Sequence, residues 1–132
     1  MGKISRDKIK GFGIKRFFLS FKYSIEGLLY AYRYEQSLWV HAIASIFVII
    51  MGIVFDIKFS EWAILFIALG SILSIELINT AIEAAVDLTT TDIHPLAKIA
   101  KDCGSAASFV LTFVSIVIAM FVFGPYITEL IK

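Results

Sequence analysis

Three long apolar stretches constrain this chain more than any other feature of its sequence. Two contain no Asp, Glu, Lys or Arg: Gln36 to Phe55, which is twenty residues, and Cys103 to Thr128, which is twenty-six. About twenty apolar residues in a helix cross the ~30 Å hydrocarbon core of a bilayer. The third run, Trp62 to Ile75, continues with helical periodicity to about Val86. The sequence therefore predicts an all-α integral membrane protein with three transmembrane helices.

The composition supports a membrane environment. Hydrophobic residues make up 59% of the 132 residues and charged residues 17%, whereas soluble domains have about 45–50% and about 25%. The single cysteine, Cys103, excludes an internal disulfide and is interpreted as structural. The net charge of +1 gives no reason to expect a nucleic-acid partner.

An amphipathic helix is predicted before the first span, over residues 16–34. Phe17, Phe21, Ile25 and Leu28 recur at helical spacing, and cationic side chains lie beside that stripe. A helix with a bulky apolar face and a cationic rim lies in the membrane interface. The alternative is a helix packed on a soluble core, which the following apolar span disfavours.

The predicted organisation is a single membrane domain, 1–132. Its parts are a mobile basic tail at 1–15, the interfacial helix at 16–34, spans at 36–55 and 62–86, and a segment at 95–126 that begins in the cytoplasm and becomes the third span. Eight of the twelve Lys and Arg residues precede the first span, and two more lie between the second and third. Because cytoplasmic loops carry an excess of these residues, we expect the N-terminus and the second loop to face the cytoplasm.

A row of polar side chains follows the apolar part of the second span. Glu76, Asn79, Glu83 and Asp87 are three, four and four residues apart, which places them within roughly 80° of one another on one helix face. An unpaired acid at membrane depth costs about 2.5–3.5 kcal/mol on insertion scales. Such acids persist when they face a bundle interior and bind something, so this face is a candidate site. The alternative is that they only mark the solvated end of a helix.

Glu35 and two lysines extend the candidate site. Glu35 lies between the interfacial helix and the first span, at the membrane level expected for Glu83. Two carboxylates from different helices suit Mg²⁺, which takes one or two protein carboxylates plus phosphate oxygens. Lys98 and Lys101 would meet phosphate on the cytoplasmic side, or alternatively only anchor the third span. Glu35 alone is more often an ordinary interfacial charge.

Two sequence elements together resemble a known family. They are Glu76-Leu-Ile-Asn-Thr-Ala-Ile-Glu83 and the stretch from His94-Pro-Leu-Ala-Lys to Lys101-Asp102. Both resemble the prokaryotic diacylglycerol kinase and undecaprenol kinase family, and the resemblance extends from about Arg16 to Tyr126. It implies a homotrimer of three-span subunits, with active sites shared between neighbouring chains, in the bacterial cytoplasmic (inner) membrane.

The resemblance also implies roles for individual residues, with ATP as co-substrate and Mg²⁺ as cofactor. Glu76 matches the proposed catalytic base, which accepts the proton of the lipid hydroxyl. Glu35 and Glu83 match the carboxylates that hold the metal. The positions matched to nucleotide or phosphate binding are Arg16, Tyr23, Asn79, Lys101 and Asp102, and Asp87, which lies beside this site, is grouped with them. No role is assigned to His41 or His94.

The function expected is transfer of phosphate from ATP to a lipid alcohol. The His94-Pro-Leu-Ala-Lys loop looks like that of undecaprenol kinases, so undecaprenol is the preferred substrate. Diacylglycerol is the alternative, because the Gly-Ser-Ala-Ala after Cys103 is like that of diacylglycerol kinases. A remoter alternative is a non-enzymatic ion channel or transporter subunit whose carboxylates line an ion path.

Overall fold

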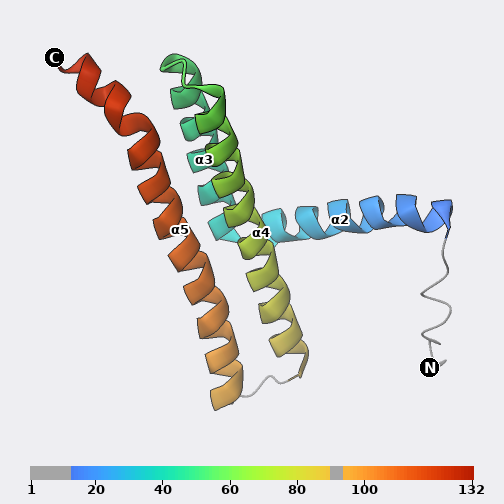
Figure 1. Cartoon of the computed structure of the whole chain (residues 1–132). Helices are drawn as coiled ribbons and strands as arrows, with labels where there is room; N and C mark the ends of the chain where they lie inside the picture. The colour runs from blue at the N-terminus through green and yellow to red at the C-terminus, as the bar shows by residue number, and fades with distance from the viewer. Residues whose placement is uncertain (1–12, 90–93) are drawn as a thin grey trace. The chain divides into compact units, whose positions relative to one another are not determined.

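The computed structural model describes residues 13–89 and 94–132, and within these ranges it contains four α-helices and no strand (Figure 1). They are α2 (Ile14–Tyr34), α3 (Gln36–Val54), α4 (Phe59–Thr89) and α5 (Pro95–Leu130). Most of the predicted basic tail and the middle of the loop before α5 lie outside the described residues.

The three later helices are each long and apolar enough to cross a membrane. The predicted fold class, an all-α membrane protein with three spans, is therefore confirmed. The helix α2 belongs to a separate unit that ends at Tyr34, and the second unit begins at Glu35. Residues 14–34 are helical, but the interfacial location of α2 stays a prediction.

The end of α3 and the start of α4 are joined by a tight turn. Asp56 adopts a positive φ of 49°, and the backbone N–H of Ile57 donates to the Gly52 carbonyl at 3.2 Å. The N–H of Lys58 donates to the Glu61 carboxylate at 2.7 Å. This side chain thus satisfies one of the amide groups that a helix leaves unpaired at its N-terminus.

Apolar side chains around this turn form the buried core of the second unit. Its most buried members are Ile57, Leu65, Val122 and Phe123, which come from the turn, α4 and α5. Burial of this cluster brings the end of α5 against the α3–α4 turn, and α4 lies beside both other helices in Figure 1. The core therefore lies at one end of the helices, and the predicted acidic residues of α4 lie further along that helix, away from the core.

Large apolar side chains elsewhere on these helices remain exposed. Phe47 on α3, Phe66 on α4 and Phe121 on α5 each expose more than half of their surface. Such a distribution is unfavourable in water and favourable in hydrocarbon, where the helices satisfy their own backbone hydrogen bonds.

The beginning of α5 follows the sequence expectation, whereas its end extends further. His94 caps the helix because its Nδ1 accepts a hydrogen bond from the Leu96 N–H at 3.2 Å, and Pro95 occupies the first helical turn, where its missing N–H costs no helical hydrogen bond. The helix then continues through Pro125 to Leu130, beyond residue 126. A proline removes one backbone donor, but its loss near the end of a helix does not terminate α5.

Candidate active site

A groove in the second unit contains polar side chains from both α3 and α4. It has a volume of ≈ 470 Å³ and lies between α3, α4 and α5. The side chains that line it are Glu35, Gln36, Ser37, His41, Glu76, Asn79, Glu83, Ser105, Ser108, Phe109 and Thr112. Three carboxylates from two segments of the chain therefore share one groove.

Glu76 is the acid most enclosed in this groove, with 5% of its surface exposed. Both of its carboxylate oxygens have partners on α3. The Ser37 hydroxyl donates to Oε2 at 2.8 Å, and His41 Nε2 lies 3.2 Å from Oε1. When Glu76 is ionised, its oxygens only accept hydrogen bonds, so Nε2 of His41 carries the proton that is donated. The cost of burying an acid at membrane depth is thereby offset by two polar contacts.

Asn79 and Glu83 form a second contact in the groove, one turn further along α4. The Asn79 amide nitrogen donates to Glu83 Oε1 at 2.9 Å. The Asn79 amide oxygen is buried without a hydrogen-bond partner among the described residues. It faces Gly104 of α5, where an added Cβ would collide with it. The absence of a side chain at Gly104 therefore lets α5 approach α4 at the site.

The charged residues after the groove are organised into two ion pairs. Lys101 of α5 pairs with Asp87 of α4 at 2.6 Å, which joins the two helices on either side of residues 90–93. Asp102 pairs with Lys98, four residues earlier on the same helix. Lys101 also lies within the electrostatic range of Glu83. The predicted site residues Asp87 and Lys101 are thus brought together, whereas the neighbours Lys101 and Asp102 have different partners.

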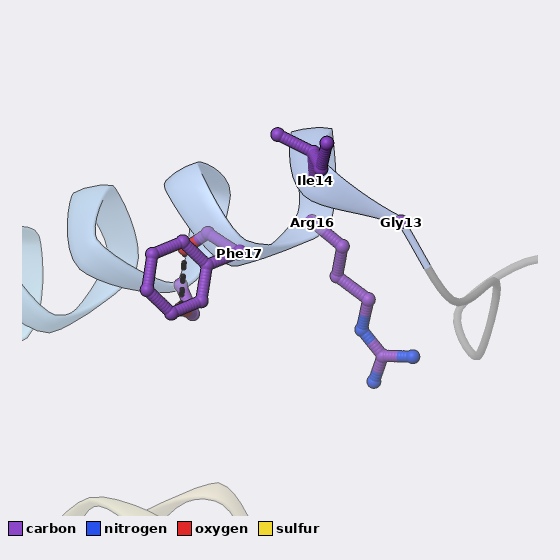
Figure 2. A pocket seen from close by; sticks show the side chains of 5 residues that line it. Gly13, Ile14, Arg16 and Phe17 are labelled. Carbon is purple, nitrogen blue, oxygen red and sulfur yellow. Dashed lines mark hydrogen bonds between the residues drawn. The ribbon is translucent and has the colours of Figure 1, made fainter.

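Arg16 and Tyr23, the remaining predicted site residues, lie on α2. Arg16 lines a hollow of ≈ 620 Å³ at the first turns of that helix, together with Ile14 and Phe17, and Figure 2 labels these residues. The dashed line marks the hydrogen bond from the Ser20 hydroxyl to the Phe17 carbonyl at 2.7 Å. Tyr23 is exposed. Because α2 is a separate unit, the roles of these two residues stay predictions.

The two predicted metal ligands, Glu35 and Glu83, line the same groove. Glu35 immediately precedes α3 in an extended conformation, and its side chain makes no capping hydrogen bond. The described residues contain no group of three or more His, Cys, Asp and Glu side chains that is close enough to hold a metal ion. Two carboxylates nevertheless fit Mg²⁺, which commonly completes its coordination with phosphate oxygens and water.

Sequence reasoning missed His41 and Ser37 as members of the site. Both are polar positions in the mainly apolar α3, four residues apart, so they share one helix face. This spacing could have predicted the contact, because a polar face on α3 is a suitable partner for the acidic face of α4. The identity of the partner depends on how the two helices pack.

Comparison with known proteins assigns the chain to a family. Residues 22–123 match the model of the family described as prokaryotic diacylglycerol kinase. The chain belongs to this family. It is a lipid kinase, and this decides against the alternative of a non-enzymatic channel or transporter subunit.

Several curated relatives cover most of this chain. The undecaprenol kinase of Bacillus subtilis is 40% identical over 112 residues, which are 85% of this chain and 91% of the relative. A diacylglycerol kinase of Helicobacter pylori is 37% identical over 93% of this chain and 91% of its own length. The diacylglycerol kinase of Pseudomonas aeruginosa is 36% identical over 85% and 92%. The expected family is thus confirmed, and it is a bacterial membrane family that uses ATP and a lipid alcohol.

Proposed function

We propose that this protein transfers the γ-phosphoryl group of ATP to the hydroxyl of undecaprenol, giving undecaprenyl phosphate. The segment from His94 to Lys98, which resembles the corresponding segment of undecaprenol kinases, supports this acceptor, as does the Bacillus subtilis relative. Diacylglycerol is the alternative acceptor, which the relatives named diacylglycerol kinase support.

Glu76 is the proposed catalytic base, and its enclosure in a groove with two further carboxylates is the observation that carries the proposal. The proton of the lipid hydroxyl passes to the Glu76 carboxylate. The lipid oxygen forms a bond to the γ-phosphorus, and the bond from that phosphorus to the β–γ bridging oxygen breaks, which releases ADP. Positioning and charge neutralisation supply most of the catalysis in such transfers.

Glu35 and Glu83 are the proposed ligands of Mg²⁺. The hard oxygens of these two residues suit this ion, and the Asn79 amide holds one Glu83 oxygen in place. A bound Mg²⁺ would neutralise charge on the phosphate oxygens of ATP. Asn79 itself is proposed to lie beside the transferred phosphate.

The nucleotide is proposed to bind next to this groove. Lys101, which Asp87 orients through their ion pair, would contact phosphate, and Asp102 would contact another part of ATP. Arg16 and Tyr23 of α2 are two further residues proposed to bind the nucleotide, because the family resemblance matches them to such positions. A cationic nitrogen near the groove favours the phosphate charge, as at other phosphoryl-transfer sites.

The active protein is proposed to be a homotrimer in the bacterial inner membrane, with its N-terminus in the cytoplasm and its sites shared between neighbouring chains. The resemblance of the sequence to the family supports this assembly. Native mass spectrometry in detergent tests the assembly, and a monomer as the only active species would contradict it.

A product assay tests the function. Purified protein in detergent receives radiolabelled ATP, Mg²⁺, and either undecaprenol or diacylglycerol at the same mole fraction. We expect phosphorylated undecaprenol to form with the higher kcat/KM, and a reaction without lipid is the control. Preference for diacylglycerol would change the assigned substrate. No phosphorylated product from either lipid would overturn the proposed function.

A further inference from the structure

From the contacts around Glu76 we infer that His41 is a positioning residue for catalysis, which aims the Glu76 carboxylate into the groove. This inference rests on the proposed function, in which Glu76 takes the proton of the lipid hydroxyl. It concerns a different helix and a residue for which the sequence suggested no role.

Two contacts, both from α3, restrict the orientation of the Glu76 carboxylate. His41 Nε2 approaches Oε1 at 3.2 Å and the Ser37 hydroxyl approaches Oε2 at 2.8 Å. Both partners lie one helical turn apart, so one rigid helix face holds both oxygens. The His41 side chain is itself 15% exposed and that of Glu76 7%, which limits competition from water. The pair therefore lies in a low-dielectric setting in which each hydrogen bond is strong.

The orientation of this carboxylate determines how well it serves as a base. A glutamate side chain has several rotatable bonds, and a general base must lie within hydrogen-bond reach of the proton that it accepts. The other acids of the groove, Glu35 and Glu83, would repel Glu76. The α5 side chains that line the groove carry hydroxyl or apolar groups and no charge. His41 is thus the only basic side chain among the described residues that line the groove.

A purely structural role for His41 makes a different prediction. If the contact only joins α3 to α4, its loss should lower stability and reduce activity to the same extent with or without Glu76. If His41 acts through Glu76, its loss should lower kcat only while Glu76 is present. The KM for ATP should stay near its wild-type value, because the side-chain contact that His41 makes in the groove is with Glu76, the proposed base.

The experiment compares three substitutions in the full-length protein in detergent, with undecaprenol and diacylglycerol as acceptors. His41→Gln places an amide nitrogen near the position of Nε2 and should retain most of the wild-type kcat. His41→Asn keeps the polarity but lacks the reach, and His41→Leu lacks a donor. Both should lower kcat about 10²-fold, the usual effect of a misplaced catalytic group. Ser45→Ala is the matched control, because Ser45 lies one turn further along α3 and donates only to the His41 carbonyl.

Combination with Glu76→Gln supplies the decisive measurement. Adding His41→Leu to Glu76→Gln should cause no further loss of kcat, because coupled residues are not additive. An additive loss, or a wild-type kcat for His41→Asn, would overturn the inference. If His41→Leu does not fold, His41→Asn still tests the inference. A wild-type protein that phosphorylates no lipid would instead overturn the proposed function, so the two failures are distinguishable.

Discussion

At the scale of single residues, the three glutamates that line the groove lie in different environments. Glu76 is enclosed and holds two partners from another helix, whereas Glu83 is bound by an amide on its own helix. Glu35 precedes α3 and uses no oxygen for capping. These differences suit one enclosed base and two acids with oxygens available to a cation.

Replacement of Glu76 tests its role as the base. Glu76→Gln keeps the volume and removes the charge, so the protein should fold and bind ATP as before. The kcat should fall about 10²–10⁴-fold, the usual contribution of a positioned general base. Steady-state kinetics and thermal unfolding in the same detergent measure both effects. A Gln variant with near-normal kcat would remove Glu76 from the mechanism.

Replacement of the two proposed metal ligands tests the cation site. Glu35→Gln and Glu83→Gln each remove one anionic oxygen ligand, so each should raise the Mg²⁺ concentration required for half-maximal activity. Excess Mg²⁺ should partly restore the rate. Glu129→Gln is the control, since Glu129 is exposed near the other end of α5. An unchanged Mg²⁺ response in both groove variants would place the cation elsewhere.

At the scale of helices, two glycines allow side chains of α4 to pack closely against the backbones of α3 and α5. Gly104 admits Asn79 at the groove, and Gly52 of α3 admits the ring of Trp62, where an added Cβ would lie 2.6 Å from the nearest ring carbon. One contact lies at the proposed active site and the other at the buried core. Substitution at the two positions should therefore affect different properties.

The contact at Gly104 leads to a prediction about activity. In Gly104→Ala the new methyl group would displace the Asn79 side chain, and with it the hydrogen bond that holds Glu83. We expect a lower kcat, about 10²-fold if the phosphate-side groups shift by about 1 Å. Gly124→Ala on the same helix is the control, because an added Cβ there meets nothing within 4 Å. Equal activity of the two variants would contradict the prediction.

A second helix-scale prediction concerns the link between the ends of α4 and α5. The Tyr126 hydroxyl donates to the Glu61 carboxylate at 2.6 Å, and this carboxylate also holds the Lys58 amide. Tyr126→Phe removes one donor and keeps the ring in the core, so the thermal unfolding temperature should fall while kcat stays unchanged. Differential scanning fluorimetry in detergent and the lipid phosphorylation assay measure these quantities. A large loss of kcat would mean that this end of the bundle also affects the groove.

At the scale of the whole molecule, charge determines the predicted orientation. Ten of the twelve Lys and Arg residues precede the first span or lie between the second and third, so we expect both segments to face the cytoplasm. The groove lies towards the end of α4 that leads into the loop between the second and third spans. With that loop in the cytoplasm, phosphoryl transfer would take place where ATP is available.

Cysteine labelling tests this orientation. In a Cys103→Ala background, a cysteine introduced at Lys58 should react with a membrane-impermeant maleimide added outside intact cells. A cysteine introduced at Leu88, which is exposed, should react only after the cells are lysed. The reverse pattern would invert the topology.

The fold class and the common face of the acidic residues on the second span could be predicted from local sequence patterns. Uncharged runs long enough to cross a bilayer predicted the three spans, because a membrane requires that length of apolar helix. The spacing of Glu76, Asn79 and Glu83 predicted their common face, because a helix repeats every 3.6 residues. These are local properties, which periodicity reveals without knowledge of the neighbouring helices.

The packing of the helices, which local patterns do not reveal, sets which other side chains line the groove. The contacts of Glu76 with Ser37 and His41 depend on how α3 packs on α4. The close contact between Asn79 and Gly104, which leaves no room for a side chain at residue 104, depends on how α5 packs on α4. Likewise, Lys101 pairs with Asp87 rather than with its neighbour Asp102. Partners on other helices are set by the rotation and separation of whole helices, which the periodicity of one segment does not encode.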